Sequence, residues 1–220
     1  MSERFREIIE AYSDGFRTHG DSPAALLGAK GRQHLRFQAL VPFVRGQDVH
    51  SVLDYGCGLA HLVPYLRSIN WKGEYYGVDI VEAFIQHARS QRHANAHFDH
   101  ILPGAKITGR YDLVFASGVF NLQTHDSVDE SREYALDTIR ELFNLSNRFL
   151  VCDFMTDYVD FRQPGSQHWL PQQLIDFSVK ELTRRFVVRH DLMPYEFTVM
   201  FYKDASIKRP ENVYESASCL

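Results

Sequence analysis

Two glycines and an acidic residue form the part of the chain best suited to chemistry. Gly56 and Gly58 follow the predicted strand Ser51–Asp54, and Asp79 lies near the end of the next predicted strand, Glu74–Ile80. Glycine permits a tight turn and lets a ligand lie against bare backbone, while the helix that follows presents its N-terminus to that ligand. An acid about 20 residues after the glycines can accept hydrogen bonds from ribose hydroxyls. The pattern therefore predicts a nucleotide-binding strand–helix–strand unit.

The same stretch helps to distinguish two kinds of nucleotide cofactor. A dinucleotide fingerprint would place a third glycine at position 61, where this chain has His61. Asp54 stands two residues before the first glycine, at the carboxyl end of a predicted strand, where ligands of open α/β sheets bind. An acid there suits a cofactor with a cationic ammonium and sulfonium better than it suits a pyrophosphate. His61 thus weakens the NAD interpretation without excluding it.

Three motifs, taken in chain order, resemble the class I S-adenosylmethionine-dependent methyltransferases. They are Asp54-Tyr-Gly-Cys-Gly, then Tyr76-Gly-Val-Asp79, then Tyr111-Asp-Leu-Val-Phe-Ala-Ser117. The resemblance covers residues 51–153 and, more loosely, most of the chain, with Ala60 in place of the family's usual third loop glycine. It implies a Rossmann-like fold, S-adenosyl-L-methionine as the cofactor, and an enzyme that transfers a methyl group.

The resemblance also implies a set of cofactor-binding residues. In the family, an acid or polar residue after the third strand contacts the adenine amine, and Asp99 is the residue in that place. The fourth strand ends at Ser117, where the acceptor should meet the methyl group. The stretch Ser117–Asn121 lacks the Asn-Pro-Pro-Tyr signature of adenine- and glutamine-amide methyltransferases, which disfavours those acceptors. The expected cofactor-binding residues are Asp54, Gly56, Gly58, Asp79, Ile80, Asp99 and Ser117, together with the cations Lys30 and Arg36.

Two cations stand upstream of the glycine turn, at the opening of a helix predicted over residues 31–44. A carboxylate on the cofactor or the substrate needs a cation, and Lys30 or Arg36 could supply it. The alternative is that both are solvated charges at the start of a helix.

Five residues are candidates for contact with the acceptor. A hydroxyl acceptor needs a base near the ends of the later strands, and His190 and His168 could act as base or orienter. An anionic acceptor needs a cation instead, for which Arg189 and Lys30 are the candidates. Tyr12, on a predicted N-terminal helix, could donate a hydrogen bond from a lid. For each histidine the alternative is a purely structural role.

Composition and charge limit the class of protein. The 220 residues are 45% hydrophobic and 24% charged, with a net charge of −4, which is typical of one globular α/β domain. The chain has no basic run of nucleic-acid-binding type and no apolar run long enough to span a bilayer. We therefore expect neither a nucleic acid nor a membrane as its partner. The three cysteines lack metal-ligand spacing, and His93 and His97 would form a metal-binding pair only on a helix. We predict a soluble, cytoplasmic protein without a metal, and the sequence does not indicate its oligomeric state.

The predicted elements form one α/β domain in three parts. Residues 1–46 are a helical lid, 47–204 the methyltransferase core and 205–220 a polar tail. The core is a Rossmann-like, seven-stranded, mostly parallel sheet with helices on both faces. Strands Phe186–Leu192 and Glu196–Lys203 form its C-terminal antiparallel hairpin.

The favoured function is S-adenosylmethionine-dependent methyl transfer to a small polar metabolite, phosphorylated and carboxylated ones included. Such transfer is an in-line displacement that depends mainly on proximity and orientation. Two alternatives stay open. One is an NAD-dependent dehydrogenase, and the other is a catalytically silent protein that binds S-adenosylmethionine as the partner of another protein.

Overall fold

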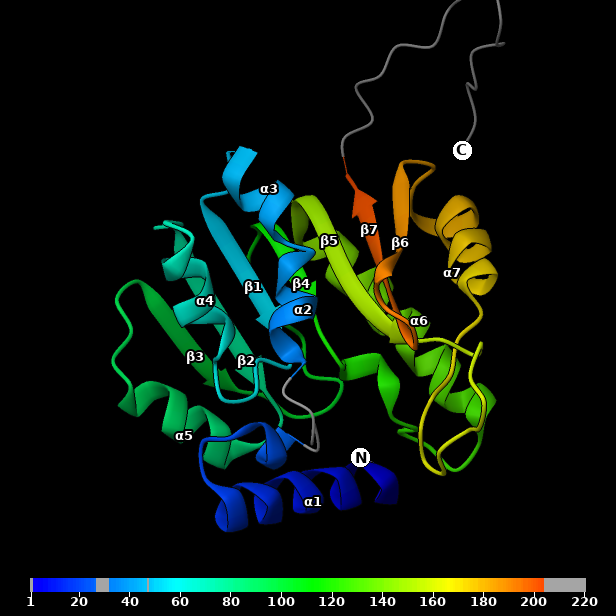
Figure 1. The fold of residues 1–220 in the computed structure, drawn as a ribbon, viewed down its shortest axis with the longest axis horizontal. Helices are drawn as coiled ribbons and strands as arrows, with labels where there is room; N and C mark the ends of the chain where they lie inside the picture. Colours follow the sequence, from blue (N-terminus) through cyan, green and yellow to red (C-terminus); the bar gives the residue numbers. More distant parts are fainter. Residues whose placement is uncertain (1, 27–31, 47, 204–220) are drawn as a thin grey trace, which may run out of the picture.

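The fold is a seven-stranded mixed sheet with helices on both faces (Figure 1). A computed structural model of the chain describes residues 2–26, 32–46 and 48–203. The strand order is β3-β2-β1-β4-β5-β7-β6. The strands are β1 (Ser51–Tyr55), β2 (Glu74–Asp79), β3 (Ala96–His100), β4 (Tyr111–Ala116), β5 (Ser146–Met155), β6 (Phe186–Met193) and β7 (Glu196–Tyr202).

The first five strands run parallel, and the last two form an antiparallel hairpin. β1 pairs with β2 and β4, β2 with β3, and β4 with β5, all in parallel register. β7 pairs antiparallel with both β5 and β6. This arrangement confirms the predicted sheet and its C-terminal hairpin. It also brings the carboxyl ends of β1, β2 and β4 to one edge, where ligands of such sheets bind.

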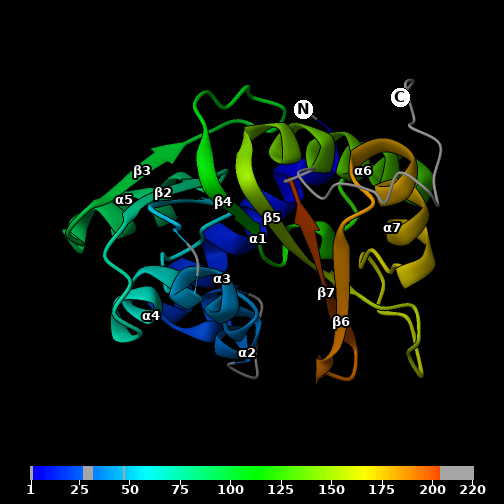
Figure 2. The same cartoon turned by 90° about the horizontal axis from the view of Figure 1, so that it is seen from above.

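Helices cover both faces of the sheet because its central strands are apolar on both sides. Residues Leu113–Ala116 of β4 have no exposed surface, as expected for a central parallel strand. Figure 2 shows α2, α3 and α4 on one side of the sheet and α6 and α7 on the other. The helical segments are α1 (Glu3–His19), η1 (Pro23–Leu26), α2 (Gln33–Gln38), α3 (Val41–Gly46), α4 (Leu62–Ser68), α5 (Glu82–Ser90), η2 (Val119–Asn121), α6 (Val128–Leu145), α7 (Pro171–Phe177) and the π-helical turn η3 (Ser178–Leu182).

Helix α1 lies across the carboxyl edge of the sheet, below the arrowheads of β1 and β2 in Figure 1. Its first turn is anchored by Ser2, whose hydroxyl accepts the Phe5 amide at 3.3 Å and donates to the Thr124 carbonyl at 2.6 Å. Towards its other end, the ring of Phe16 meets that of Phe84 edge-on, with centroids 5.7 Å apart. α1 is therefore attached both to the segment before α6 and to α5, and it covers the sheet edge.

Two helix predictions are corrected by the structure. The single helix predicted over 31–44 is two short helices, α2 and α3, because Pro42 has no amide hydrogen with which to continue the bonding of α2. The helix predicted over 59–69 begins only at Leu62, because Ala60 adopts a left-handed conformation with φ of 62°. The polar tail predicted at 205–220 lies outside the described residues. Within 2–26, 32–46 and 48–203, no helix combines the length and the apolarity needed to cross a bilayer.

Candidate cofactor and acceptor site

The glycine turn after β1 has a backbone that only glycine adopts easily. Gly56 and Gly58 have φ of 78° and 54°, values that side chains disfavour. A Cβ atom at Gly56 would lie 2.5 Å from Cγ2 of Val119. The amides of Gly56 and Cys57 both donate to the Val78 carbonyl, at 2.8 and 3.0 Å. These bonds tie the turn to the end of β2, which carries the predicted ribose-binding acid.

Asp79 holds this turn and faces the pocket beside it. Its Oδ2 accepts the Gly58 amide and its Oδ1 accepts the Val81 amide, both at 2.8 Å. Burial raises the pKa of Asp79 to about 6, although the backbone amides oppose that shift. Each carboxylate oxygen keeps a second lone pair, so Asp79 can still accept hydrogen bonds from ligand hydroxyls.

Asp54 does not take the place predicted for it. It is not among the described residues that line the pocket. Its carboxylate instead accepts a hydrogen bond of 2.5 Å from the buried hydroxyl of Tyr75 on β2. Side chains alternate along a strand, so Asp54 turns towards the face covered by α4, and its neighbour Tyr55 turns towards α6. Burial raises the pKa of Asp54 to about 7. Asp54 therefore supports the turn from within the sheet.

One pocket joins the glycine turn to the space between α1 and α6. The space between its walls is about 1140 Å³, part of which is open to solvent. Arg36 and Asp79 are the only charged side chains among its described lining residues. The uncharged side chains of the lining include Phe5, Tyr12, Gln33, Tyr55, Ile80, Ile101, Ser117, Phe120, Leu122, Tyr134 and Gln167.

Arg36 lines this pocket, but its charge is already paired. Its Nε and Nη2 donate to the two carboxylate oxygens of Glu196 at 2.6 and 2.7 Å, a bidentate pair between α2 and β7. Asp153, buried at the end of β5, adds a second negative charge near Arg36 and accepts the Gly118 amide at 2.7 Å. Arg36 thus fixes α2 against the sheet.

Tyr12, on α1, lines the pocket. Burial raises the pKa of Tyr12 to about 12, and the nearby charge of Asp79 adds to the shift. Its hydroxyl therefore stays protonated at neutral pH and can donate a hydrogen bond to a ligand, but it cannot serve as a base.

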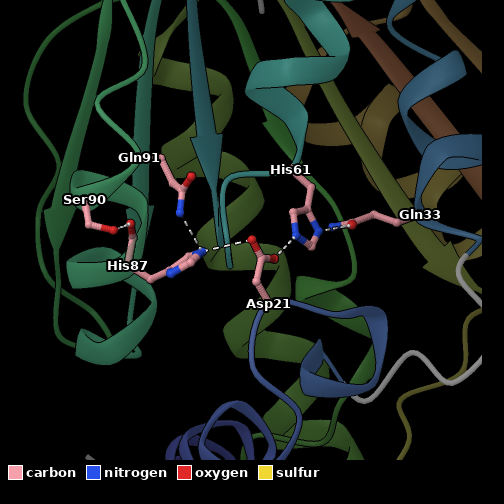
Figure 3. A network of polar contacts seen from close by, with 6 residues as sticks. All are labelled: Asp21, Gln33, His61, His87, Ser90 and Gln91. Atoms are coloured by element: carbon pink, nitrogen blue, oxygen red, sulfur yellow. Dashed lines mark hydrogen bonds and ion pairs between the residues drawn. The ribbon is translucent and has the colours of Figure 1, made fainter.

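A polar network ties the segment after α1 to the rim of the pocket (Figure 3). Asp21 accepts contacts from two histidines, 2.6 Å from Nε2 of His61 and 3.0 Å from Nε2 of His87. The other ring nitrogen of His61 lies 2.9 Å from Oε1 of Gln33, which lines the pocket. His61, the residue that replaces a dinucleotide-binding glycine, thus connects the segment after α1 to Gln33 on α2.

Four other predicted site residues lie away from this pocket. On the edge strand β6, Arg189 pairs with Asp191 at 2.6 Å, and Nε2 of His190 lies 3.2 Å from the Pro194 carbonyl. Asp99 pairs at 3.1 Å with Arg89, its side chain 78% exposed. His168 lines a separate cavity, beside Arg132 and Asp157. These placements do not support the acceptor roles of the two histidines and Arg189, or the adenine contact of Asp99.

The remaining predictions are placed as follows. Gly56, Gly58, Ile80 and Ser117 all line the pocket. Lys30 lies outside the described residues. His93 and His97 form no metal site, and no group of metal-binding side chains occurs within 2–26, 32–46 and 48–203.

Sequence reasoning missed several lining residues, above all Gln167. The sequence singles out His168 as a candidate base or orienter but gives no signal for its neighbour Gln167. Ser166 and His168 line the separate cavity, whereas Gln167 between them faces the main pocket. Side chains alternate in this way along an extended chain. A prediction of extended structure for residues 166–169 would have placed Gln167 and His168 on opposite sides. Tyr55 stands at the variable second position of the Asp54-Tyr-Gly-Cys-Gly motif, and Tyr134 on α6 belongs to no motif.

Comparison with known proteins gives a family and several relatives. The family model described as "Methyltransferase domain" matches residues 47–184. A protein of Mycobacterium tuberculosis (strain ATCC 25618 / H37Rv), named "Putative methyltransferase Rv1506c", is 27% identical over 162 residues, which are 73% of this chain and 97% of that protein.

Solved structures share the fold at low sequence identity. Magnesium protoporphyrin IX methyltransferase (ChlM) from Synechocystis PCC 6803, crystallised with SAH, is 18% identical, with a TM-score of 0.61 over 92% of this chain and 94% of its own. The plantazolicin methyltransferase BpumL, in complex with a triazolic desmethylPZN analog and SAH, is 12% identical, with a TM-score of 0.62 over 93% of this chain and 100% of its own.

Proposed function

Because the chain belongs to the methyltransferase-domain family, we propose that it transfers the methyl group of S-adenosylmethionine to a small, neutral polar acceptor bound between α1 and α6. The family, the class I fold and the cofactor agree with the sequence-based predictions and confirm them. The acceptor is our proposal. The observation that carries it is the single pocket that runs from Asp79 and the glycine turn to the space lined by Tyr134 and Gln167.

The residues at one end of the pocket fit the cofactor. Asp79 offers carboxylate oxygens for ribose hydroxyls, and the turn at Gly56 and Gly58 offers bare backbone. Ser117, at the end of β4, lines the pocket, and its hydroxyl lies beside the carboxyl group of Asp153. When bound, S-adenosylmethionine supplies an activated methyl group for in-line displacement.

The protein's own contribution is to orient the acceptor and to exclude water. α1 covers the carboxyl edge of the sheet, and the acceptor end of the pocket is walled by apolar and aromatic side chains. Holding two reactants in line accounts for much of the rate of such a transfer. No histidine, lysine or glutamate occurs among the described lining residues. This supports an acceptor that needs little help from a base.

The charge of the lining supports a neutral acceptor over an anionic one. A phosphate or carboxylate would need an unpaired cation. Arg36, the one cation among the described lining residues, already serves Glu196 and lies near the charge of Asp153. Methylation of a small neutral metabolite is therefore the narrower form of the function that the sequence favoured.

Calorimetric titration of the purified protein tests the cofactor assignment. We expect S-adenosylmethionine and S-adenosylhomocysteine to bind and NAD not to bind. Asp79→Ala should abolish both affinities while the circular dichroism spectrum stays unchanged. Asp99→Ala is the matched control, because Asp99 lies outside the pocket. Binding of NAD alone, or equal affinity in both variants, would contradict the assignment.

A screen for methyl transfer tests the acceptor class. The protein is incubated with S-adenosylmethionine and a set of neutral, phosphorylated and carboxylated metabolites, and S-adenosylhomocysteine is measured. We expect turnover with neutral members only. Turnover confined to the anionic members would refute the neutral-acceptor proposal. Cofactor binding without turnover of any member would favour the catalytically silent alternative.

A further inference from the structure

The side chain of Gln167 is buried in the pocket wall with both of its polar atoms unused. Its exposure is 1%, and neither Oε1 nor Nε2 has a hydrogen-bond partner among the described residues. It lines the main pocket. A buried amide without partners costs free energy that an apolar side chain of similar size would not. An unpaired amide in a pocket wall is therefore a group prepared for a ligand.

The backbone around Gln167 holds this amide in place. The Gln167 amide donates to the Asn121 carbonyl at 2.9 Å, and the Gln123 amide donates to the Gly165 carbonyl, also at 2.9 Å. Trp169 is fully buried, and its Nε1 donates to the Phe120 carbonyl at 2.9 Å. The segment is thus bonded to residues 120–123 on both sides of Gln167. A fixed backbone favours selective recognition because little order is lost when a ligand binds.

The surroundings of Gln167 set the character of the rest of the ligand. Phe5, Phe120 and Leu122 line the same pocket, and each contributes apolar surface. Asp153, near the end of β5, accepts the Gly118 amide with one carboxylate oxygen. Asp153 is not among the described residues that line the pocket. Beside Gln167 the wall thus offers its neutral donor–acceptor pair next to aromatic and aliphatic surface.

We propose that Gln167 recognises the acceptor molecule by pairing its Oε1 and Nε2 with a donor and an acceptor that lie side by side on it. The chemical class with that feature is a carboxamide, or the amide-like edge of a lactam or heterocycle, attached to an apolar body. The amide serves as the handle by which the molecule is held, and the methylated atom lies elsewhere on it. The inference rests on the proposed function and narrows its acceptor class.

The test uses benzamide as a probe of the protein loaded with S-adenosylhomocysteine. Acetophenone has the same ring and a carbonyl but no amide donor, and benzoate carries a negative charge. We expect calorimetry to give benzamide an affinity about tenfold above that of either analogue, since one good hydrogen bond accounts for a difference of this size. Equal affinities for benzamide and acetophenone, or no binding of benzamide, would overturn the proposal.

Substitutions then locate the preference. Gln167→Leu should reduce the benzamide preference to within about twofold while leaving the affinity for S-adenosylhomocysteine unchanged. Its melting temperature should equal or exceed that of the wild type, because no hydrogen bond is lost and an unpaired amide is removed. Gln163→Leu, an exposed position in the same loop, is the matched control and should keep the preference.

The outcomes separate this inference from the function on which it rests. A wild-type protein that binds no S-adenosylhomocysteine refutes the proposed function and the inference with it. A protein that binds S-adenosylhomocysteine but keeps its benzamide preference in Gln167→Leu refutes the inference alone. If Gln167→Leu does not fold, Gln167→Met provides a flexible side chain of similar length for the same measurement. The comparison of benzamide with acetophenone on the wild type needs no variant.

Discussion

The carboxylate of Asp21 lies 2.6 Å from Nε2 of His61, and this contact joins the segment after α1 to the loop before α4 (Figure 3). The second oxygen of Asp21 contacts His87 on α5 at 3.0 Å. The segment after α1 is thus fastened both to the loop before α4 and to α5. The pKa of Asp21 is lowered by its hydrogen bonds to the two histidines, which outweigh the opposing effect of burial. The aspartate therefore stays ionised at neutral pH.

We expect Asp21→Asn to weaken the binding of S-adenosylhomocysteine severalfold. The amide lacks the charge that attracts both histidines, so the lid should open more often. The side chain of Asp21 is 43% exposed, and solvent screening limits such contacts to about 1 kcal/mol or less, which corresponds to a loss of up to about fivefold. Calorimetry at neutral pH and low salt measures it.

Asp14→Asn is the matched control for this change. Asp14 lies on α1 and makes an exposed pair with Arg17 at 3.0 Å, so its substitution removes the same charge without touching the network. It should leave the affinity unchanged. Equal effects of the two substitutions would show that the contact between Asp21 and His61 does not hold the lid.

The affinity for S-adenosylhomocysteine should fall as the pH is lowered through about 6. Burial raises the pKa of Asp79 to about 6 in the ligand-free protein. Below that pH the carboxyl group holds a proton and accepts hydrogen bonds less well, so binding must first remove the proton. We expect a loss approaching tenfold per pH unit well below 6. Titrations between about pH 5 and pH 8 measure it, and an affinity that stays constant over this range would contradict the role given to Asp79.

Asp54→Asn should stabilise the protein, and the gain should grow as the pH rises from about 5 to about 8. The pKa of Asp54 is about 7 in the fold, above its usual value of 3.8. Between these values the folded protein binds a proton that the unfolded chain has lost, so stability falls as the pH rises. The asparagine removes this loss and still accepts the Tyr75 hydroxyl.

We expect the gain in the free energy of unfolding to be about 1–3 kcal/mol larger at about pH 8 than at about pH 5. Urea denaturation of both proteins at the two pH values measures this difference. A loss of stability at about pH 8 would show that the charge of Asp54 is favourable in the fold.

The parts of the molecule that follow from local patterns could be predicted, and the side-chain contacts between elements could not. The glycine turn and Asp79 stand where apolar strands end, and their positions in the pocket follow from sheet topology alone. Asp54 belongs to the same motif, but its partner Tyr75 is set by the register of β1 against β2. No sequence pattern specifies that a tyrosine on the neighbouring strand meets this acid.

The predicted acceptor residues show the same limit. His190 and Arg189 were placed near the site because they lie on a late strand, yet β6 is the outermost strand of the sheet, beyond β7. The order of the last strands decides this, and chain order alone would place the sixth strand next to the fifth. The role proposed for Gln167 has no signal in the sequence. It depends on the lack of a hydrogen-bond partner for the side-chain amide among the described residues, and only the packed structure reveals this.

Arg36→Met should destabilise the protein more than Glu196→Gln does. The pair is mostly buried, with 25% and 17% of the two side chains exposed, and removing one partner of such a pair leaves the other charge uncompensated. Loss of Arg36 leaves two acids, Glu196 and the buried Asp153, without their cation, whereas loss of Glu196 leaves Arg36 with Asp153. We expect costs in the free energy of unfolding of about 2–4 kcal/mol for Arg36→Met and about 1–2 kcal/mol for Glu196→Gln, measured by urea denaturation.

The double variant should cost less than the sum of the two single changes. Equal costs for the single variants would show that Asp153 does not share the charge of Arg36.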